Sequence, residues 1–404
     1  MTSTAEPVLF DPADPELRRD PYPTYRRMRE VAPAWRSPTG IWYFTRYADS
    51  FELFRSPALS YDSTATAAYQ ASLSSDPEER ARQLEETRRN RSLLDVDPPE
   101  HTRLRSLINR AFTAPVVEAA RPRIVGFVDQ LMDAFEGPVV DLVGAYGSLL
   151  PIIVICDMMG VDPAERHEFL DIGHAVARSV DPDVPLEEKL AANQRMRTYI
   201  GGLLDARRAT PGDDLTTRLI QAAADGRVTE EELVINTGIL LVAGFETTTN
   251  LITNAVYRLV THPDQLARLR AEPGLIKSAI EEVLRFDPPS QFMRPRTIIA
   301  EVEVGGARLH PGDPVVPLIA AANRDPEEFP DPDTFDIGRT PNRHFSFGVG
   351  PHLCVGAALA RMEAQIAVER LFDRYPNLSL VDEELEYRPN LQLRGFAKLN
   401  ARLG

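Results

Sequence analysis

The sequence predicts a mainly α-helical fold with a small β portion, organised as one domain over residues 1–404. Helical periodicity of apolar residues runs through most of the chain between residues 98 and 286. A short stretch of alternating Val and Glu residues after Arg296 is typical of a small sheet. With 43% hydrophobic and 26% charged residues the chain can build a large core, and neither an internal repeat nor a compositional break divides it.

Each expected element has its own local signal. Aromatic and β-branched residues at 41–47 predict a strand, whereas residues 60–91, rich in Ser, Ala, Glu and Arg, predict a surface segment with short helices. Residues 229–260 contain no proline and predict one long central helix, and a helix at 276–286 ends before two prolines. Further helices are expected at 21–30, at 98–112, in several pieces up to 209 and at 356–375, with coil at 327–343 and mixed strands and turns after 377.

Composition restricts the class of protein. The formal net charge of −15 argues against nucleic acid or an anionic membrane as a partner. The first residues show no basic stretch followed by an apolar run, so no signal peptide is expected. The longest apolar run, residues 149–156, is far shorter than the roughly 20 residues of a membrane-spanning helix. Cys156 and Cys354 are too far apart for a CxxC site. We therefore expect a soluble, cytoplasmic, monomeric protein.

The segment 347–356, FGVGPHLCVG, is the most informative part of the sequence. Its glycines permit tight turns and close approach of the backbone to a flat partner. Cys354 lies near the start of the next helix, where the helix dipole favours a thiolate, and a thiolate ligand donates electron density to haem iron. The alternatives are a small buried cysteine or a phosphate-binding loop. The spacing GxGxxG fails, however, because Leu353 stands at the third glycine position, and the phosphate-loop lysine is missing.

This segment resembles the haem-binding loop of the cytochrome P450 superfamily, and the chain looks like a soluble bacterial member similar to macrolide- and polyketide-tailoring enzymes. The resemblance implies a cytochrome P450 fold, with haem b (iron protoporphyrin IX) between the long central helix and the helix that follows the cysteine. It implies that Cys354 is the axial iron ligand and that His352 contacts a haem propionate. Phe347, Gly348 and Gly356 are then expected against the haem.

The central helix carries a second motif, AGFETT at 243–248. Small residues at its start leave room for a flat group and a diatomic ligand, and a glycine within a helix costs about 1 kcal/mol relative to alanine. Glu246 and Thr247 form an acid–alcohol pair suited to proton delivery when an O–O bond is split, and the stretch resembles the family's AGxET pattern. The alternative is that Thr247 bonds back to a helix carbonyl and Glu246 is solvated. Helical spacing places on one face Leu240, Ala243, Gly244, Thr247, Thr248 and Leu251.

Glu282 and Arg285 form an ExxR pair with i, i+3 spacing on the helix expected at 276–286. An exposed pair of this kind adds little stability. The family resemblance instead implies a buried pair that supports the core beneath the haem, with Arg339 as its third partner. Removing one partner would then leave a buried charge without compensation.

Basic residues in separate segments are candidates for binding the haem carboxylates. His101 and Arg105 lie one helical turn apart and can face the same anion. Arg296 opens the small sheet at a point where the family places an arginine. Arg294 is a competing candidate, but the distance to the following glycine pair favours Arg296. Each of these residues, taken singly, is equally well explained as an exposed basic residue.

The resemblance implies a haem-thiolate monooxygenase that hydroxylates or epoxidises a lipophilic natural product, a macrolide or polyketide of antibiotic biosynthesis. It would use O2 and electrons from a ferredoxin and ferredoxin reductase. A terpenoid or steroid hydroxylase stays open, as do a peroxide-driven peroxygenase and a non-catalytic haem carrier or sensor. The pair Glu246–Thr247 argues against a carrier, which needs no proton delivery. An acidic ferredoxin is expected to dock near the cysteine loop, on Arg103, Arg110, Arg343 and Arg361.

Substrate contacts are expected from several segments around the central helix. The lining should be mostly apolar, with polar points at Gln291 and Arg294. The sequence does not indicate which substrate is oxidised, at which atom, or from which redox protein the electrons come. The candidate contacts are Leu240, Gln291, Phe292, Leu393 and Phe396, together with residues 60–91 and the region of 174–180.

Overall fold

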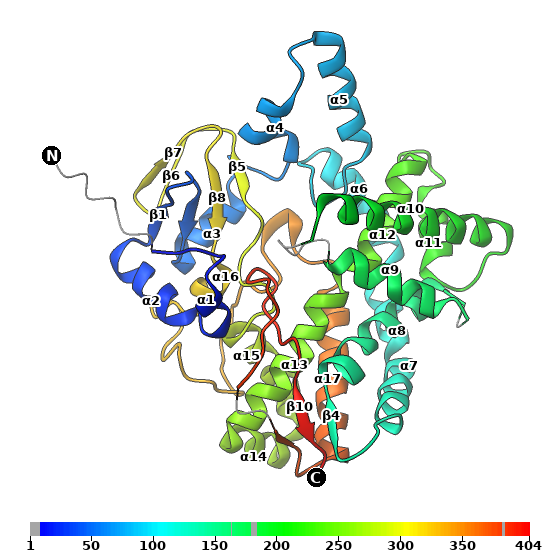
Figure 1. Cartoon of the computed structure of the whole chain (residues 1–404), viewed down its shortest axis with the longest axis vertical. Coiled ribbons are helices and arrows are strands. Elements are labelled where there is room, and N and C mark those ends of the chain that lie inside the picture. The colour runs from blue at the N-terminus through cyan, green and yellow to red at the C-terminus, as the bar shows by residue number, and fades with distance from the viewer. Residues whose placement is uncertain (1–8, 163, 179–183, 382–383) are drawn as a thin grey trace.

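The computed structural model describes residues 9–162, 164–178, 184–381 and 384–404. It has the predicted class, a mainly helical fold with small sheets (Figure 1). The helices are α1 Pro15–Arg19, α2 Tyr22–Val31, α3 Tyr47–Arg55, α4 Ala67–Ser72, α5 Pro77–Arg89, α6 Glu100–Ala111, α7 Ala114–Asp133, α8 Leu149–Met159, α9 Arg166–Arg178, α10 Leu186–Ala209, α11 Leu215–Ala223, α12 Glu230–Ala243, α13 Phe245–Thr261, α14 Pro263–Ala271, α15 Ile276–Phe286, α16 Ile319–Ala322 and α17 Ala357–Arg374. Short helical turns are η1 Ser63–Ala65, η2 Val143–Gly147, η3 Pro273–Leu275 and η4 Gly350–His352. The strands are β1 Ala34–Arg36, β2 Trp42–Phe44, β3 Leu59–Ser60, β4 Val139–Asp141, β5 Arg296–Ile298, β6 Val302–Val304, β7 Ala307–Leu309, β8 Pro314–Pro317, β9 Ser379–Leu380 and β10 Asn400–Arg402.

Several local predictions are confirmed within two residues. The helices expected at 21–30, 98–112, 276–286 and 356–375 are α2, α6, α15 and α17. The stretch 327–343 contains neither helix nor strand, as its prolines predict. Within the described ranges, no helix combines the length and the apolar character needed to cross a membrane.

The small sheets lie beside the helical body, and the largest has the order β1-β2-β8-β5-β3. Strands β2 and β8 are parallel, whereas β5 runs antiparallel to β8. Arg296 stands opposite Val315 in this register, so the sheet fixes the backbone from which the Arg296 side chain extends. The β6–β7 hairpin turns at Gly305 and Gly306, whose φ angles of 57° and 77° favour glycine.

The central helix is interrupted, which corrects the prediction of one continuous helix over residues 229–260. Helix α12 begins at a capping box formed by Thr229 and Glu232 and ends at Ala243. Gly244, with φ −85° and ψ −18°, separates it from α13. Glycine stabilises a helix poorly, and the Thr247 hydroxyl donates a hydrogen bond to the Ala243 carbonyl at 3.1 Å, which perturbs the regular ladder.

Helix α13 is the centre of the helical body, and α17 runs alongside it (Figure 1). Leu251, Ile252, Ala255, Val256 and Leu259 are each at most 1% exposed and pack with residues of α7, α15 and α17. Burying one such side chain contributes about 1.5–3 kcal/mol. The helix that carries the candidate motif is therefore fixed by packing.

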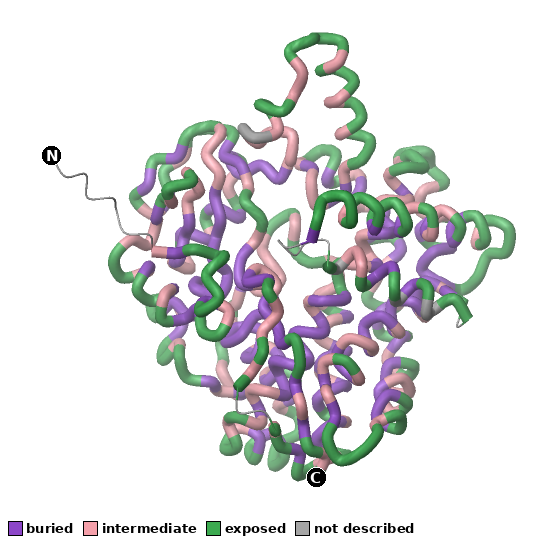
Figure 2. Tube along the Cα trace, viewed as in Figure 1, coloured by how far each residue is buried: buried purple, intermediate pink, exposed green. Residues whose placement is uncertain are grey.

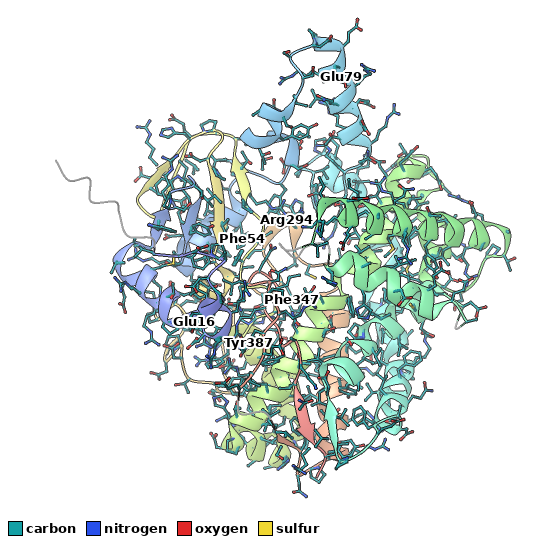
Figure 3. The ribbon with its side chains drawn as sticks, in the orientation of Figure 1. Glu16, Phe54, Glu79, Arg294, Phe347 and Tyr387 are labelled. Carbon is teal, nitrogen blue, oxygen red and sulfur yellow. The ribbon has the colours of Figure 1, made fainter. Side chains whose placement is uncertain are left out.

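The α4–α5 segment projects from the body, and Figure 2 shows it as largely exposed. Every residue of α5 is exposed or half-buried, and Glu79 marks the region near its tip in Figure 3. Asp76 caps α5 by accepting the backbone N–H groups of Glu78 and Glu79. The prediction of a surface segment with short helices is confirmed.

Candidate functional site

A mainly apolar cavity lies between the junction of α12 with α13 and the loop that precedes α17. The helix junction and the cysteine loop, more than 90 residues apart in sequence, both line it. Of the residues predicted for the site, the lining includes Arg105, Leu240, Ala243, Gly244, Thr247, Phe347, Gly348, His352, Cys354 and Gly356.

The cysteine loop presents Cys354 to this cavity. The backbone N–H of Cys354 donates to the Phe347 carbonyl at 2.9 Å, and Gly348 and Gly350 turn the chain with φ angles of 72° and 76°. Cys354 is exposed to the cavity, in contrast to the fully buried Cys156. Enclosure by the protein raises the pKa of the Cys354 thiol, while the N–H group of Gly356 and nearby guanidinium groups oppose this shift. A cationic metal at this point would favour the thiolate further.

The helix junction forms another wall of the cavity. Thr247 is half-buried there, and its hydroxyl donates to the Ala243 carbonyl, as the alternative interpretation of this residue expected. The hydroxyl oxygen keeps its capacity to accept a hydrogen bond from the cavity. Glu246 does not line the cavity. It is 4% exposed, and its Oε1 lies 3.1 Å from Nη1 of Arg388. Sequence reasoning missed Arg388, because no local pattern links a tail arginine to the central helix.

The basic residues predicted to bind carboxylates gather at one edge of the cavity. The rings of His101 and His352 lie 4.0 Å apart, and Tyr61 stacks on His352 at 3.7 Å. The Arg296 guanidinium lies 4.5 Å from the Tyr61 ring. Burial lowers the pKa of Arg296 to about 10 and, reinforced by its cationic neighbours, lowers the pKa of His352 to about 3. Tyr61 was not predicted, because an aromatic residue before a loop carries no specific signal.

This edge fits the carboxylates of a haem. His101 Nε2 and Arg296 Nε are buried and have no hydrogen-bond partner among the described residues. Likewise, in the part of the chain that the structure describes, no carboxylate forms an ion pair with Arg105 or Arg296. Buried donors without partners cost free energy, so an anionic group is the missing complement. Arg294 instead pairs with Asp95 at 2.8 Å and is largely exposed.

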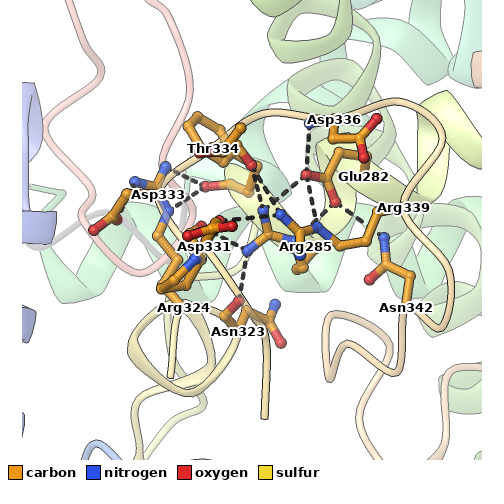
Figure 4. Close-up of polar contacts among 12 residues, drawn as sticks. Glu282, Arg285, Asn323, Arg324, Asp331, Asp333, Thr334, Asp336, Arg339 and Asn342 are labelled. Carbon is orange, nitrogen blue, oxygen red and sulfur yellow. Dashed lines mark hydrogen bonds and ion pairs between the residues drawn. The ribbon is translucent and has the colours of Figure 1, made fainter. Parts of the chain in front are cut away.

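The ExxR pair is buried and fully coordinated (Figure 4). Arg285 donates to both Glu282 oxygens at 2.8 Å, and both side chains are 0% exposed. Arg339 Nε lies 3.2 Å from Glu282 Oε1, as predicted for the third partner. The remaining donors of Arg285 bind the carbonyls of Asn323, Pro332 and Thr334, and Glu282 also accepts from Asn342 and the Asp336 backbone. The long coil is therefore held by its backbone carbonyls.

The predicted substrate contacts differ in whether they line the main cavity. Leu240 lines the cavity, but Gln291, Phe292, Leu393 and Phe396 do not. Gln291 is fully buried, with its amide donating to the Pro288 carbonyl. Phe292 packs against aromatic residues of the N-terminal region. From this segment the cavity is lined instead by Pro289, Ser290 and Met293, and from the loop before α6 by Leu93 and Leu94.

Neighbouring predictions have mixed outcomes. His174 and Arg178 lie outside this cavity, and residues 179–180 of the predicted region are outside the described residues. Residues 60–91 contribute no lining side chain to the cavity as described.

Sequence reasoning also missed Glu363 of α17, which lines the cavity although it is only 3% exposed. Burial raises the pKa of Glu363 to about 8. Its position in an ordinary helical pattern gave no signal.

The arginines predicted for donor docking are mostly paired within the chain. Arg103 binds Glu232, Arg110 binds Asp225 and Arg361 binds Glu281. Arg343 is exposed, and its backbone carbonyl accepts from the Tyr47 hydroxyl. These acidic partners reduce the positive potential that the sequence alone suggested.

Comparison with known proteins gives a consistent result. The cytochrome P450 family model matches residues 185–399. The cytochrome P450 monooxygenase PikC of Streptomyces venezuelae is 39% identical, covering 99% of this chain and 95% of that protein. The vitamin D(3) 25-hydroxylase of Pseudonocardia autotrophica is 38% identical over 96% of this chain and 94% of its own length. The Bacillus subtilis cytochrome P450 PksS of the bacillaene polyketide synthase has a TM-score of 0.88 and 33% identity, covering 98% of this chain and 100% of that one.

Proposed function

The chain belongs to the cytochrome P450 family, and we propose that it hydroxylates or epoxidises a lipophilic natural product, a macrolide or other polyketide of antibiotic biosynthesis. As a member of this family it is a haem-thiolate monooxygenase. The observation that carries the proposal is that Cys354 and Thr247 reach one apolar cavity from different elements. Such a cavity suits a large lipophilic substrate beside an oxygen-activating centre.

The proposed cofactor is haem b, and this chain offers a complete set of contacts for it. Cys354 would supply the iron ligand. When bound, the haem supplies activation of O2 and transfer of one oxygen atom to an unactivated C–H or C=C bond. The groups that would hold its carboxylates are His101, Arg105, Arg296 and His352, and those that would lie against its faces are Ala243, Gly244, Phe347, Gly348 and Gly356.

Glu246 and Thr247 are proposed to move protons. Thr247 offers a hydroxyl oxygen in the cavity while its own proton is held by the Ala243 carbonyl. Glu246, the preceding residue, is buried and faced by the Arg388 guanidinium. Both residues lie in the first turn of α13, where successive side chains point about 100° apart, so the carboxyl and the hydroxyl reach different sides of the same turn. Proton delivery by a positioned group contributes typically about 10²–10⁴-fold to a rate.

A polyketide substrate is supported by the similarity to the polyketide synthase-associated PksS. A steroid- or terpenoid-like substrate is the second candidate, supported by the similarity to a vitamin D(3) 25-hydroxylase. Both would contact Leu240, Leu94 and Met293 in the apolar lining. A spectral titration of the haem-loaded protein against macrolides, other polyketides, terpenes and steroids tests the choice. Binding of steroids alone would overturn the polyketide proposal.

Electrons are proposed to come from a ferredoxin and its reductase, with docking near Leu353 and Arg343. Leu353 precedes Cys354 and is 46% exposed. A ferredoxin that contacts Leu353 would therefore lie close to the proposed iron ligand, which shortens the path of the electron to the haem. Product formation should require NADPH, O2 and the two redox proteins. Efficient turnover with peroxide alone and none with the redox chain would indicate a peroxygenase instead.

The proton role is tested with Thr247→Ala. The variant should retain haem but release most reducing equivalents as hydrogen peroxide, with product per NADPH falling about tenfold or more. Thr247→Ser is the matched control, since it keeps the hydroxyl.

In a separate test, Cys354→Ser should lose the red-shifted Soret band of the reduced carbon monoxide complex. An unchanged band would remove Cys354 from the proposed ligand position.

A further inference from the structure

A second cavity, of about 440 Å³, borders the N-terminal turn of α13, and we call it the side cavity. It is formed where β4, η2, α9 and the tail loop of residues 388–397 meet this turn. Arg388, His174, Thr249, Asn250 and Phe396 contribute to its lining. None of the residues proposed above to hold the haem lines it, whereas His174 and Phe396, which the sequence suggested as substrate contacts, do.

Three consecutive residues connect the side cavity to the main cavity. Phe245 lines both cavities, and Thr247 lines the main one. Between them, Glu246 is buried and lies 3.1 Å from Arg388, whose side chain is 22% exposed. The guanidinium that neutralises Glu246 is thus itself part of the side-cavity wall. A carboxylate buried without a cation would be strongly disfavoured, so Arg388 stabilises the ionised form of Glu246.

The side cavity has the character of a water site. Asn250 lines it and is 1% exposed, and its Nδ2 donor has no hydrogen-bond partner in the described ranges. A buried amide donor left without a partner costs about 1–3 kcal/mol, which bound water relieves. The cavity is many times larger than the roughly 30 Å³ that one water molecule occupies. Gly395 keeps the tail close here, because a Cβ at that position would collide with the Asn250 side chain.

The charges that face Glu246 and the side cavity come from several elements. Arg388 comes from the tail, His174 and Arg178 from α9, and Asp141 from β4. The Asp141 oxygens accept backbone N–H groups of residues 143, 144 and 399, so this carboxylate already has donors. Burial and the Arg388 charge both lower the pKa of His174, which keeps its ring neutral near pH 7. Arg388 is therefore the charge that dominates at Glu246.

We propose that protons enter the reaction through the side cavity and that Arg388 is the positioning residue that holds Glu246 at the inner end of this route. The inference rests on the proposed function, whose net reaction converts RH, O2, two electrons and two protons into ROH and H2O. The electrons come from the reduced ferredoxin and the protons from water in the side cavity. When Glu246 gives up a proton toward Thr247 it becomes a carboxylate again, and Arg388 stabilises that product.

The test compares Arg388→Ala with Arg388→Lys in the haem-loaded enzyme, and Arg178→Ala serves as a control that removes a guanidinium from the same cavity. With O2 and the redox chain, Arg388→Ala should form about tenfold less product per NADPH, and Arg388→Lys should restore much of it. With hydrogen peroxide as the oxidant, which brings both protons with it, Arg388→Ala should keep its turnover. Equal losses under both conditions would overturn the proposal, because they would indicate a structural role.

An infrared measurement gives a readout that is independent of catalysis. In Arg388→Ala, Glu246 should be protonated at neutral pH, so the spectrum should gain the carbonyl band of a protonated carboxyl group. Buried Glu363, with a pKa of about 8, already contributes such a band in every variant, so the gain is measured as a difference from the unmodified enzyme. This additional band should be absent from Arg388→Lys, and it should vanish in the double variant Arg388→Ala/Glu246→Gln. A spectrum without this band would overturn the assignment of Arg388. Arg388→Gln, a closer replacement in shape, provides the same comparison if the alanine variant does not fold.

The failure of this inference can be distinguished from the failure of the proposed function. Glu246→Gln should lose product per NADPH as Arg388→Ala does. If Glu246→Gln keeps full coupling, the proton role of Glu246 is wrong. If Glu246→Gln uncouples the enzyme and Arg388→Ala does not, only the entry route through Arg388 is wrong.

Discussion

Two groups of charged side chains lie near the main cavity, and they differ in whether the chain balances their charges. Around Glu282 and Arg285, every guanidinium donor finds a carboxylate or carbonyl of this protein (Figure 4). Around Arg296, in contrast, basic side chains gather with aromatic rings and leave buried donors without partners in the described part of the chain. Each group contains arginines with little exposure to solvent, but a carboxylate accompanies them only in the first.

The difference separates a structural site from a binding site. A balanced group is complete at the end of folding, and its loss should appear as instability. A group with excess charge of one sign leaves buried donors unsatisfied, and the opposite charge that they need comes from a bound ligand. The presence of arginines does not distinguish the two groups, but the pairing of their charges does.

The largest effect is expected from breaking the balanced group. Glu282→Gln leaves Arg285 and Arg339 without their carboxylate, which should destabilise the protein by about 3–5 kcal/mol. Urea unfolding measures this, and haem content on purification should fall with it. The matched control is Glu79→Gln, which breaks an exposed pair with Arg82 at the same i, i+3 spacing. That change should cost less than about 1 kcal/mol, and comparable losses in the two variants would contradict the comparison.

Glu363 extends the comparison to a buried acid that forms no ion pair with a cation among the described residues. Its pKa of about 8 lies above the ordinary 4.5, so the folded state binds the proton more tightly than the unfolded state. Below pH 4.5 both states are protonated, and between about 4.5 and 8 rising pH favours unfolding. Glu363→Gln should therefore stabilise the haem-free protein by roughly 3 kcal/mol at pH 7 and by little at pH 4. Unfolding at both pH values measures this, with the exposed Glu369→Gln on the same helix as control; equal gains at both pH values would refute the assignment.

Arg296→Gln probes the group with excess charge. Haem affinity should fall about ten- to hundredfold, since hydrogen bonds between charged groups contribute roughly 1.5–3 kcal/mol. The haem-free protein should be no less stable, because the variant removes a buried cation that has no carboxylate partner in the described structure. Haem transfer kinetics and unfolding of the haem-free form measure the two effects. Arg294→Gln, which breaks an exposed pair, is the control and should leave haem affinity unchanged.

The smallest effect is expected at the proposed docking surface. Arg343→Gln should slow reduction by an acidic ferredoxin by about fivefold or less, with a weaker dependence on salt. Arg361→Gln changes more than charge, because it leaves Glu281 with His344 as its one remaining ion-pair partner among the described residues. Stopped-flow reduction at two ionic strengths measures both variants. A larger loss in Arg343→Gln at high salt than at low salt would contradict an electrostatic role.

Much of the fold was predictable, because its signals are local. Proline pairs and helical periodicity bounded α15, and the absence of regular periodicity identified the coil at 327–343. The interruption at Gly244 was not predicted, since the break depends on how the Thr247 hydroxyl competes with backbone N–H groups for the Ala243 carbonyl within a packed helix. Most of the cavity lining was not predicted, for a related reason. Which side chains of residues 289–293 face the cavity depends on pairing with the tail, where the Gln291 N–H donates to Gln392.

The sequence by itself determined the chemistry that the chain carries: a cysteine in a glycine-rich loop, an acid–alcohol pair on a helix and an ExxR pair, each within a few consecutive residues. Only the tertiary structure decided which of these groups have their charge paired within the chain, which are buried, and which face the cavity. Arg388 meets Glu246, and Tyr61 meets His352, across long stretches of sequence. Periodicity gives the direction of a side chain relative to its own helix, but its partner on another element is fixed only when the elements pack.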